Sequence, residues 1–302
     1  MKFGFSLEPP LWPEEPGAAM VQAARDAERI GLQYVLMSSH VLHNEHGAAV
    51  DPLVLLSAVA GATSRIGLAT SVLVLPYYHP VVLANQVASL DALSGGRLTL
   101  GVGTGWNPQE FAALDVPVRQ RGRRTDDSLE VMKAIWSGTT AQLPERFGVL
   151  REAVGGVRPT SPGGPPIWVG GHSDASIRRA VRFGAGWHGS GISHDDAQFF
   201  RERIDELAAE VGRDPSTVEI STVAFLVPPG FHAVRHVPGR LLGGGVGASA
   251  EAIVEDLSLL GEAGVTMCSL WIPIEAHRVT EALEWFAADV LPRVTVRSHS
   301  PI

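Results

Sequence analysis

The stretch IGLATSVLVLPYYHPVVLANQVASLDALSGGRLTLGVGTG, from Ile66 to Gly105, has the pattern of a strand, a loop, a helix and a second strand. Its first ten residues, Ile66 to Leu75, are almost all apolar or β-branched, which is typical of a strand buried on both faces of a parallel sheet. From Pro80 to Gly95 apolar residues recur at helical spacing, with proline at the start and two glycines at the end. Arg97 to Val102 is expected to be the second strand. The stretch predicts one βαβ unit, and α/β folds place their sites at the loops that follow the strands.

The rest of the chain repeats this alternation. The expected strands are residues 2–7, 32–37, 66–75, 97–102, 167–169, 185–188, 218–227 and 265–272. The expected helices are residues 18–30, 52–62, 80–94, 123–137, 173–183, 195–211, 250–263 and 276–291. Strict βα alternation over 302 residues favours a single (β/α)8 TIM barrel over a doubly wound sheet.

We expect one domain over residues 1–302. Residues 106–122 are predicted to be a long loop. Residues 138–166 are rich in glycine and proline and are predicted to be an insertion on the C-terminal face of the barrel. Residues 293–302 are expected to form a loose tail.

The composition of the chain argues against several classes of function. A net charge of −8 argues against nonspecific nucleic-acid binding. No apolar run reaches the length of a membrane span, and the start, MKFGFSLEPP, has no signal-peptide pattern, so a cytoplasmic protein is expected. The single Cys268 excludes an internal disulfide and a cysteine-based zinc site.

Two glycine-rich segments follow predicted strands. Gly101-Val-Gly103-Thr-Gly105 does not have the spacing of a dinucleotide fingerprint, and a tight turn and a ligand contact are equally compatible with it. The next residue, Trp106, offers an aromatic face on which a planar ring could stack. Gly170-Gly171-His172-Ser173 opens a predicted helix, so it is either an ordinary N-cap or a phosphate site. Its place in the second half of the barrel favours phosphate.

Two polar clusters remain. His40, His43 and His46 recur every three residues, but this is not a zinc-binding spacing, so a metal site is disfavoured. His40 directly follows the second strand, where it is either a structural histidine or a proton relay at the barrel mouth. Arginines 119, 121, 123 and 124 lie at a predicted helix start, where cations are unfavourable unless an anion binds.

In this order and spacing the motifs are characteristic of a known family. They are Thr70–Leu73 (TSVL), Asn85–Leu98 (NQVASLDALSGGRL), Gly101–Trp106 (GVGTGW), Arg121–Asp127 (RGRRTDD) and Pro165–Gly171 (PPIWVGG). The chain resembles the bacterial-luciferase-like superfamily of flavin- or deazaflavin-dependent oxidoreductases, and within it the branch that uses coenzyme F420.

The resemblance implies roles for particular residues. A cis peptide bond between Ser71 and Val72 would form a bulge that supports the tricyclic ring, and His40 would lie near the reactive ring. The usual acidic neighbour of that histidine is replaced here by Ser39. Trp106 stands where sugar-phosphate dehydrogenase relatives have a proton-donating glutamate, which argues against that reaction. The predicted cofactor-binding residues are Ser39, His40, Thr70, Ser71, Val72, Gly103, Thr104, Gly105, Trp106, Gly170, Gly171 and His172.

The resulting hypothesis is an enzyme that transfers hydride between coenzyme F420 and a small or medium organic substrate. His40 would relay the proton, and Trp12 and Trp106 would line the substrate side of the pocket. The arginine cluster suits the anionic tail of the deazaflavin. The alternatives are an FMN-dependent monooxygenase fed by a separate reductase, a metal-dependent hydrolase using the histidine loop, and a non-catalytic cofactor-binding barrel. Relatives are commonly homodimers, so a homodimer is expected.

Overall fold

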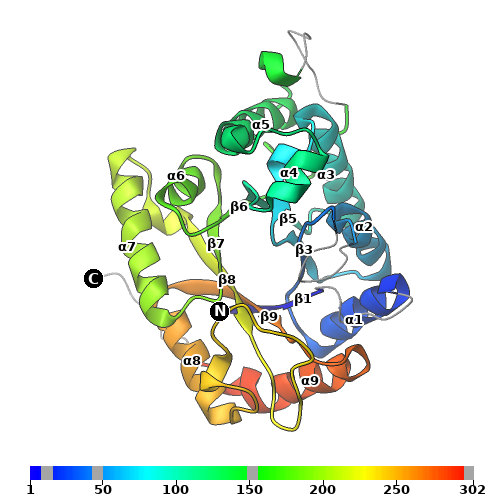
Figure 1. Cartoon of the computed structure of the whole chain (residues 1–302), viewed down its shortest axis with the longest axis vertical. Helices are drawn as coiled ribbons and strands as arrows, with labels where there is room; N and C mark the ends of the chain where they lie inside the picture. Colours follow the sequence, from blue (N-terminus) through cyan, green and yellow to red (C-terminus); the bar gives the residue numbers. More distant parts are fainter. Residues whose placement is uncertain (8–15, 43–49, 148–155, 296–302) are drawn as a thin grey trace.

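The strands close into a barrel. The computed structural model describes residues 1–7, 16–42, 50–147 and 156–295. The strands are β1 (Lys2–Ser6), β2 (Tyr34–Met37), β3 (Gly67–Thr70), β4 (Leu73–Val74), β5 (Leu98–Gly103), β6 (Ile167–Gly170), β7 (Gly186–Ser190), β8 (Glu219–Phe225) and β9 (Val265–Trp271). They pair in parallel in the order β3-β2-β1-β9-β8-β7-β6-β5-β4, and β3 also pairs with β5, which closes the sheet. The predicted (β/α)8 barrel is confirmed (Figure 1).

The predicted strand 66–75 is broken in two. Segments β3 and β4 are parts of one barrel strand, and both lie beside β5. The break falls at Ser71–Val72, whose peptide bond is cis, as the family resemblance implied. After β4 the chain turns into a short 3-10 helix, Leu75–Tyr77, instead of continuing as a strand.

Helices surround the barrel (Figure 1). They are α1 (Pro16–Ile30), α2 (Pro52–Ala62), α3 (Pro80–Ser94), α4 (Pro108–Ala113), α5 (Arg121–Trp136), α6 (Asp174–Phe183), α7 (His194–Glu210), α8 (Ala250–Glu262) and α9 (Val279–Trp285). Local sequence sets their ends. Asp51 caps α2 by accepting hydrogen bonds from the backbone N–H groups of Leu53 and Val54. Gly95, with φ of 69°, ends α3 in the left-handed conformation.

Two predictions about helices are wrong. Residues 106–122 are not only loop, because α4 begins behind the N-cap Asn107 and a 3-10 turn covers Val118–Gln120. The final helix is not continuous either: α9 is flanked by a 3-10 turn and followed by a π-helical turn over Phe286–Val290. Of the predicted insertion, residues 148–155 lie outside the described part, as do residues 296–302 of the tail.

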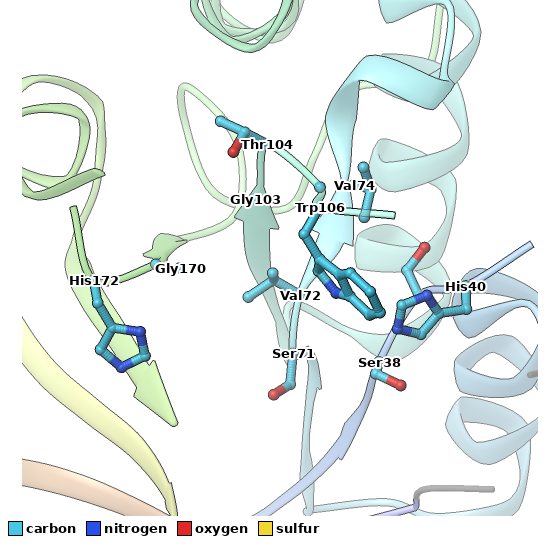
Figure 2. Close-up of a pocket in the computed structure, with 13 residues that line it drawn as sticks. Ser38, His40, Ser71, Val72, Val74, Gly103, Thr104, Trp106, Gly170 and His172 are labelled. Carbon is cyan, nitrogen blue, oxygen red and sulfur yellow. The ribbon is translucent and has the colours of Figure 1, made fainter. Parts of the chain in front are cut away.

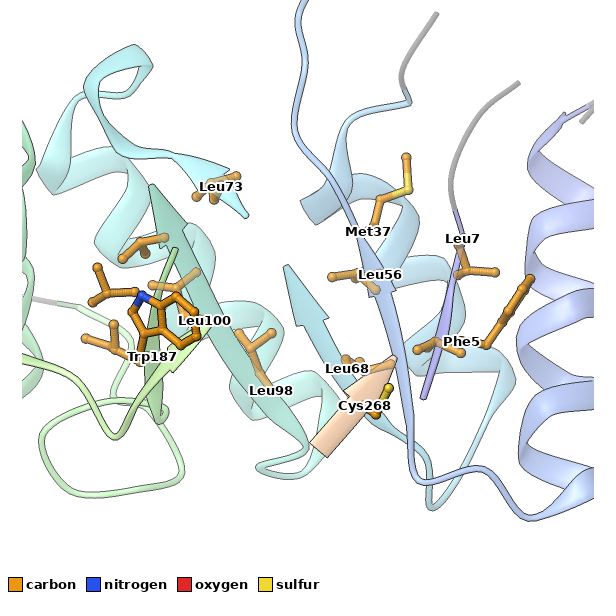
Figure 3. Packing of buried hydrophobic residues seen from close by; sticks show 14 of the residues in the cluster. Phe5, Leu7, Met37, Leu56, Leu68, Leu73, Leu98, Leu100, Trp187 and Cys268 are labelled. Carbon is orange, nitrogen blue, oxygen red and sulfur yellow. The ribbon is translucent and has the colours of Figure 1, made fainter. Parts of the chain in front are cut away.

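The core lies mainly between the strands and the helices. On β2, Val35 and Met37 face this layer, whereas Leu36 packs inside the barrel with Ala69, Trp168 and other inward residues. Figure 3 shows part of the outer layer, in which strand side chains such as Leu98 and Leu100 pack with helix residues. Among the described residues, no helix has the length and apolarity needed to cross a membrane.

Candidate active site

A pocket of about 410 Å³ opens where β2, β4, β5 and β6 end. It is lined by Ser38, Ser39, His40, Ser71, Val72, Val74, Gly103, Thr104, Gly105, Trp106, Gly170, Gly171 and His172. This size falls in the range of sites that hold a small molecule or cofactor. In Figure 2, Val72 projects between the pair formed by His40 and Trp106 and, on the other side, His172.

Glycines make room for Val72. A Cβ atom on Gly103 would lie 2.7 Å from Val72 Cγ2, and one on Gly170 would lie 2.9 Å from Val72 Cγ1. A Cβ on Gly101 would collide with the carbonyl oxygen of Thr70. The glycines of β5 and β6 therefore form a cradle into which the Val72 side chain fits from the pocket side. Val72 is thereby held as a fixed apolar projection at the pocket floor.

His40 is held by a buried carboxylate that the sequence did not reveal. Glu110, on α4, is fully buried, and its two oxygens lie 3.2 and 3.3 Å from His40 Nδ1. Because an ionised carboxylate only accepts hydrogen bonds, Nδ1 carries the proton. The other ring nitrogen, Nε2, has no hydrogen-bond partner among the described residues, so it can exchange a proton with a ligand in the pocket. Glu110 thus supplies the acidic partner that Ser39 does not.

The remaining contacts of Glu110 keep it ionised. Its oxygens accept hydrogen bonds from the backbone N–H groups of Val41, at 2.8 Å, and Leu42, at 3.2 Å, and from the Tyr77 hydroxyl at 3.0 Å. Burial alone would raise the pKa of Glu110, but these hydrogen bonds and the nearby His40 outweigh it, so the pKa is lowered. Conversely, burial and the same carboxylate raise the pKa of Tyr77. The phenol therefore stays protonated and acts as a donor to Glu110.

Trp106 forms the outer wall beside His40. Its indole is 58% exposed and meets the His40 ring edge-on, with centroids 5.7 Å apart and an interplanar angle of 75°. The left-handed φ of 74° at Gly105 turns the chain here, and a Cβ on this glycine would meet Val74 at 2.6 Å. An exposed indole beside a glycine turn offers a planar ligand a surface for stacking.

The opposite wall is the segment from Gly170 to His172. The His172 ring packs edge-on against Trp187 at 5.9 Å. The N-terminus of α6 follows, where the Ser173 hydroxyl caps the helix by accepting from Ser176 N. Asp174 lies in the first turn and is bonded to two arginines, whose hydrogen bonds lower its pKa. This carboxylate already complements the helix dipole, so the phosphate role of Gly170 and Gly171 stays a prediction.

The predicted cofactor-binding residues, with one exception, are brought together in the pocket. The exception is Thr70, which is buried in the wall and donates its hydroxyl proton to the Gly101 carbonyl at 2.6 Å. Trp12, predicted on the substrate side, lies outside the described residues. The residues that sequence reasoning missed are Ser38 and Val74 in the lining and Glu110 behind it. A signal for Glu110 existed, since Asn107-Pro108 marks a helix start with an acidic residue in its first turn.

The described residues offer no metal centre. No group of three or more His, Cys, Asp or Glu side chains in the described ranges is arranged to hold a metal ion. His40 is engaged by Glu110, and its predicted companions His43 and His46 lie outside those ranges. The chemistry of the described pocket is therefore that of an apolar floor, a stacking wall and a carboxylate-held imidazole.

Comparison with known proteins assigns this arrangement to a family. A family model described as luciferase-like monooxygenase matches residues 1–228, and so spans strands β1 to β8 and every pocket residue. The chain belongs to the luciferase-like monooxygenase family. The family resemblance predicted from the motifs is thus confirmed.

Luciferase-like relatives differ in their cofactors and reactions. The F420-dependent hydroxymycolic acid dehydrogenase of Mycobacterium tuberculosis is 32% identical over 213 residues, covering 69% of this chain and 58% of that protein. The 4-hydroxyprotoasukamycin monooxygenase of Streptomyces nodosus subsp. asukaensis is 31% identical over 228 residues, covering 70% and 60%. The crystal structure of monooxygenase RslO1 from Streptomyces bottropensis superposes with a TM-score of 0.81 at 23% identity, covering 98% of this chain and 100% of that one. The chain spans about 60% of the length of the curated relatives it matches.

Proposed function

We propose that this chain is an oxidoreductase that transfers hydride between the deazaflavin coenzyme F420 and a small or medium organic substrate. The observation that carries the proposal is the His40–Glu110 pair at a pocket floored by Val72. A hydride moves together with a proton when an alcohol and a carbonyl interconvert, and such a pair can take or give that proton. The 32% identity to an F420-dependent dehydrogenase supports the same class of reaction.

The pocket would suit a flat tricyclic ring. Val72, seated in its glycine cradle, would contact one face of the ring, and the exposed indole of Trp106 would border it. Backbone groups of Gly103 to Gly105 and Gly170 to Gly171 can approach a ligand closely because no side chains intervene. When bound, the deazaflavin supplies a carbon that accepts or donates hydride and does not activate oxygen. The chain itself orients the ring and shapes a pocket around the reacting groups.

His40 would hold the proton at its other ring nitrogen, Nε2. With Nδ1–H directed at Glu110, neutral His40 presents an acceptor at Nε2 and takes up a proton as the substrate hydroxyl loses it. The resulting imidazolium lies 3.2 Å from a carboxylate that the fold keeps ionised. Glu110 therefore stabilises the protonated relay without exchanging protons itself, which makes it a positioning residue.

The second candidate is an FMN-dependent monooxygenase that receives reduced flavin from a separate reductase. The 31% identity to a curated monooxygenase favours it. The same floor and stacking wall would accept the FMN ring. The two candidates differ in oxygen use, since only reduced FMN oxygenates its substrate.

Paired assays distinguish the F420-dependent dehydrogenase from the FMN-dependent monooxygenase. A panel of alcohols and carbonyl compounds is incubated anaerobically with oxidised or reduced F420, and the deazaflavin absorbance is followed for the wild type, His40→Gln and the exposed control His277→Gln. We expect turnover by the wild type and the control, with a loss of roughly 10²–10⁴-fold in His40→Gln. Substrate-dependent oxygen uptake with reduced FMN, and no anaerobic turnover with F420, would favour the monooxygenase instead.

A further inference from the structure

A buried hydrogen-bonded chain runs from the pocket into the barrel interior. Ser71 is a residue of the pocket lining, and its Oγ lies 2.9 Å from His188 Nε2, while His188 Nδ1 lies 2.8 Å from Ser221 Oγ. His188 on β7 and Ser221 on β8 are both buried and are not in the lining. The Trp168 ring stacks on the imidazole at 5.7 Å with an interplanar angle of 6°. His188 is therefore clamped in position without touching the pocket.

The hydrogen bonds from Ser71 through His188 to Ser221 have one consistent donor–acceptor direction. Ser221 Oγ lies 3.2 Å from the carbonyl oxygen of Trp187, which can only accept, so the Ser221 hydroxyl donates there. Its lone pairs then accept from His188 Nδ1–H. Because a neutral imidazole carries one N–H, Nε2 is left as the acceptor, and the Ser71 hydroxyl donates to it. Ser71 consequently has lone pairs, and no proton, to offer to the pocket.

His188 stays neutral in this setting. The charged form would be buried among Trp168 and two serine hydroxyls, with His172 nearby. Burial foremost, and His172 to a lesser degree, lower the pKa of His188 to about 4. A serine–histidine–serine array is also the layout of a nucleophilic site, but a base this weak, backed by a hydroxyl in place of a carboxylate, cannot activate Ser71. The array orients a hydroxyl and does not deprotonate it.

We propose that His188 is a positioning residue that fixes Ser71 as a hydrogen-bond acceptor toward the pocket, so that the ligand group placed against Ser71 must be a donor. Two sources carry such a donor: the imide N–H of a flavin or deazaflavin ring, and an N–H or O–H of the substrate. That the cofactor ring is the donor rests on the proposed function. That Ser71 is an acceptor toward the pocket rests only on the hydrogen bonds that join it to His188 and Ser221.

The polarity is tested on the free protein by nitrogen-15 NMR of the histidine side chains at pH 7, with His188→Gln identifying the His188 resonances. We expect the tautomer protonated at Nδ1, unchanged from pH 8 down to about 5. A tautomer protonated at Nε2, or an imidazolium at pH 7, overturns the proposal. Ser221→Ala removes the acceptor of Nδ1–H, and we expect it to mix the two tautomers. This readout does not depend on any cofactor.

The ligand is tested by titrating F420 and FMN, without substrate, into the wild type, Ser71→Ala, His188→Gln, the double variant and the control Ser89→Ala. The Ser89 hydroxyl donates to the carbonyl oxygen of Asn85 within α3. If the ring supplies the donor, Ser71→Ala weakens cofactor binding by roughly three- to tenfold. His188→Gln should weaken cofactor binding less than Ser71→Ala does, because the glutamine amide can present either its oxygen or its nitrogen to Ser71. Combined with Ser71→Ala, it should cause no further loss of binding. If the substrate supplies the donor, cofactor binding is unchanged and the KM for substrate rises instead. If neither changes, the proposal fails, whereas no cofactor binding by the wild type refutes only the proposed function.

Discussion

Replacing Gly103 by alanine tests the cradle that seats Val72. The new Cβ would lie 2.7 Å from Val72 Cγ2, whereas carbon atoms in contact are about 3.5–4.0 Å apart. The Val72 side chain must therefore move away from residue 103 by about 1 Å. Overpacking of this kind costs about 1–3 kcal/mol of unfolding free energy. Moving Val72, which lines the pocket, would also weaken cofactor binding.

The assay is urea unfolding of Gly103→Ala, Val72→Ala and the double variant, followed by circular dichroism. Truncating Val72 removes the atoms that clash, so the double variant should be no less stable than Val72→Ala alone, which gives a coupling energy of about 1–3 kcal/mol. Gly61→Ala is the matched control: no atom lies within 4 Å of its added Cβ, and at this next-to-last position of α2 alanine should not destabilise the fold. The cradle would be refuted if Gly103→Ala were as stable as the wild type. It would also be refuted if Gly103→Ala lowered the unfolding free energy equally in the wild-type and Val72→Ala backgrounds.

Three further results are expected. The lowered pKa of Glu110 means that its ionised form stabilises the fold above the usual value of 4.5, and this contribution is lost as the pH falls through the folded pKa. The difference in unfolding free energy between the wild type and Glu110→Gln should thus shrink as the pH falls below about 4.5, and a difference that stays constant with pH would contradict this. Burial raises the pKa of the Cys268 thiol to about 12, so thiol reagents at neutral pH should label it only in denaturant, and rapid labelling of the native protein would contradict its burial. Leu93 and Val82 on α3 are 76% and 56% exposed, so we expect this face to join two copies in a homodimer. Light scattering should then give a dimer mass for the wild type and a monomer mass for Leu93→Glu, and a monomeric wild type would count against the dimer.

The barrel was predictable because its elements are local. Buried parallel strands are apolar runs and their helices carry apolar residues at regular spacing, so periodicity located the strands and most helices. What periodicity could not show is the break inside the strand 66–75. Ser71 and Val72 look like any strand residues, and only the family resemblance pointed to the cis bond between them.

The polar partners in the site were not predictable for a different reason. Glu110 meets His40 across 70 residues of sequence, and Ser71 meets His188 across 117. Such contacts depend on which strand ends and loops the closed barrel brings together, and no local pattern encodes them. Glu110 was hidden further because its helix, α4, has only six residues and was expected to be loop.

We propose that this pocket holds a deazaflavin. Equilibrium titration of the purified chain with F420 and with FMN, followed by fluorescence, tests it most directly, with Gly103→Ala as the variant that narrows the same pocket. We expect micromolar or tighter binding of F420, weaker binding of FMN, and reduced F420 affinity in the variant. Micromolar binding of FMN alone, or F420 binding that Gly103→Ala leaves unchanged, would contradict it.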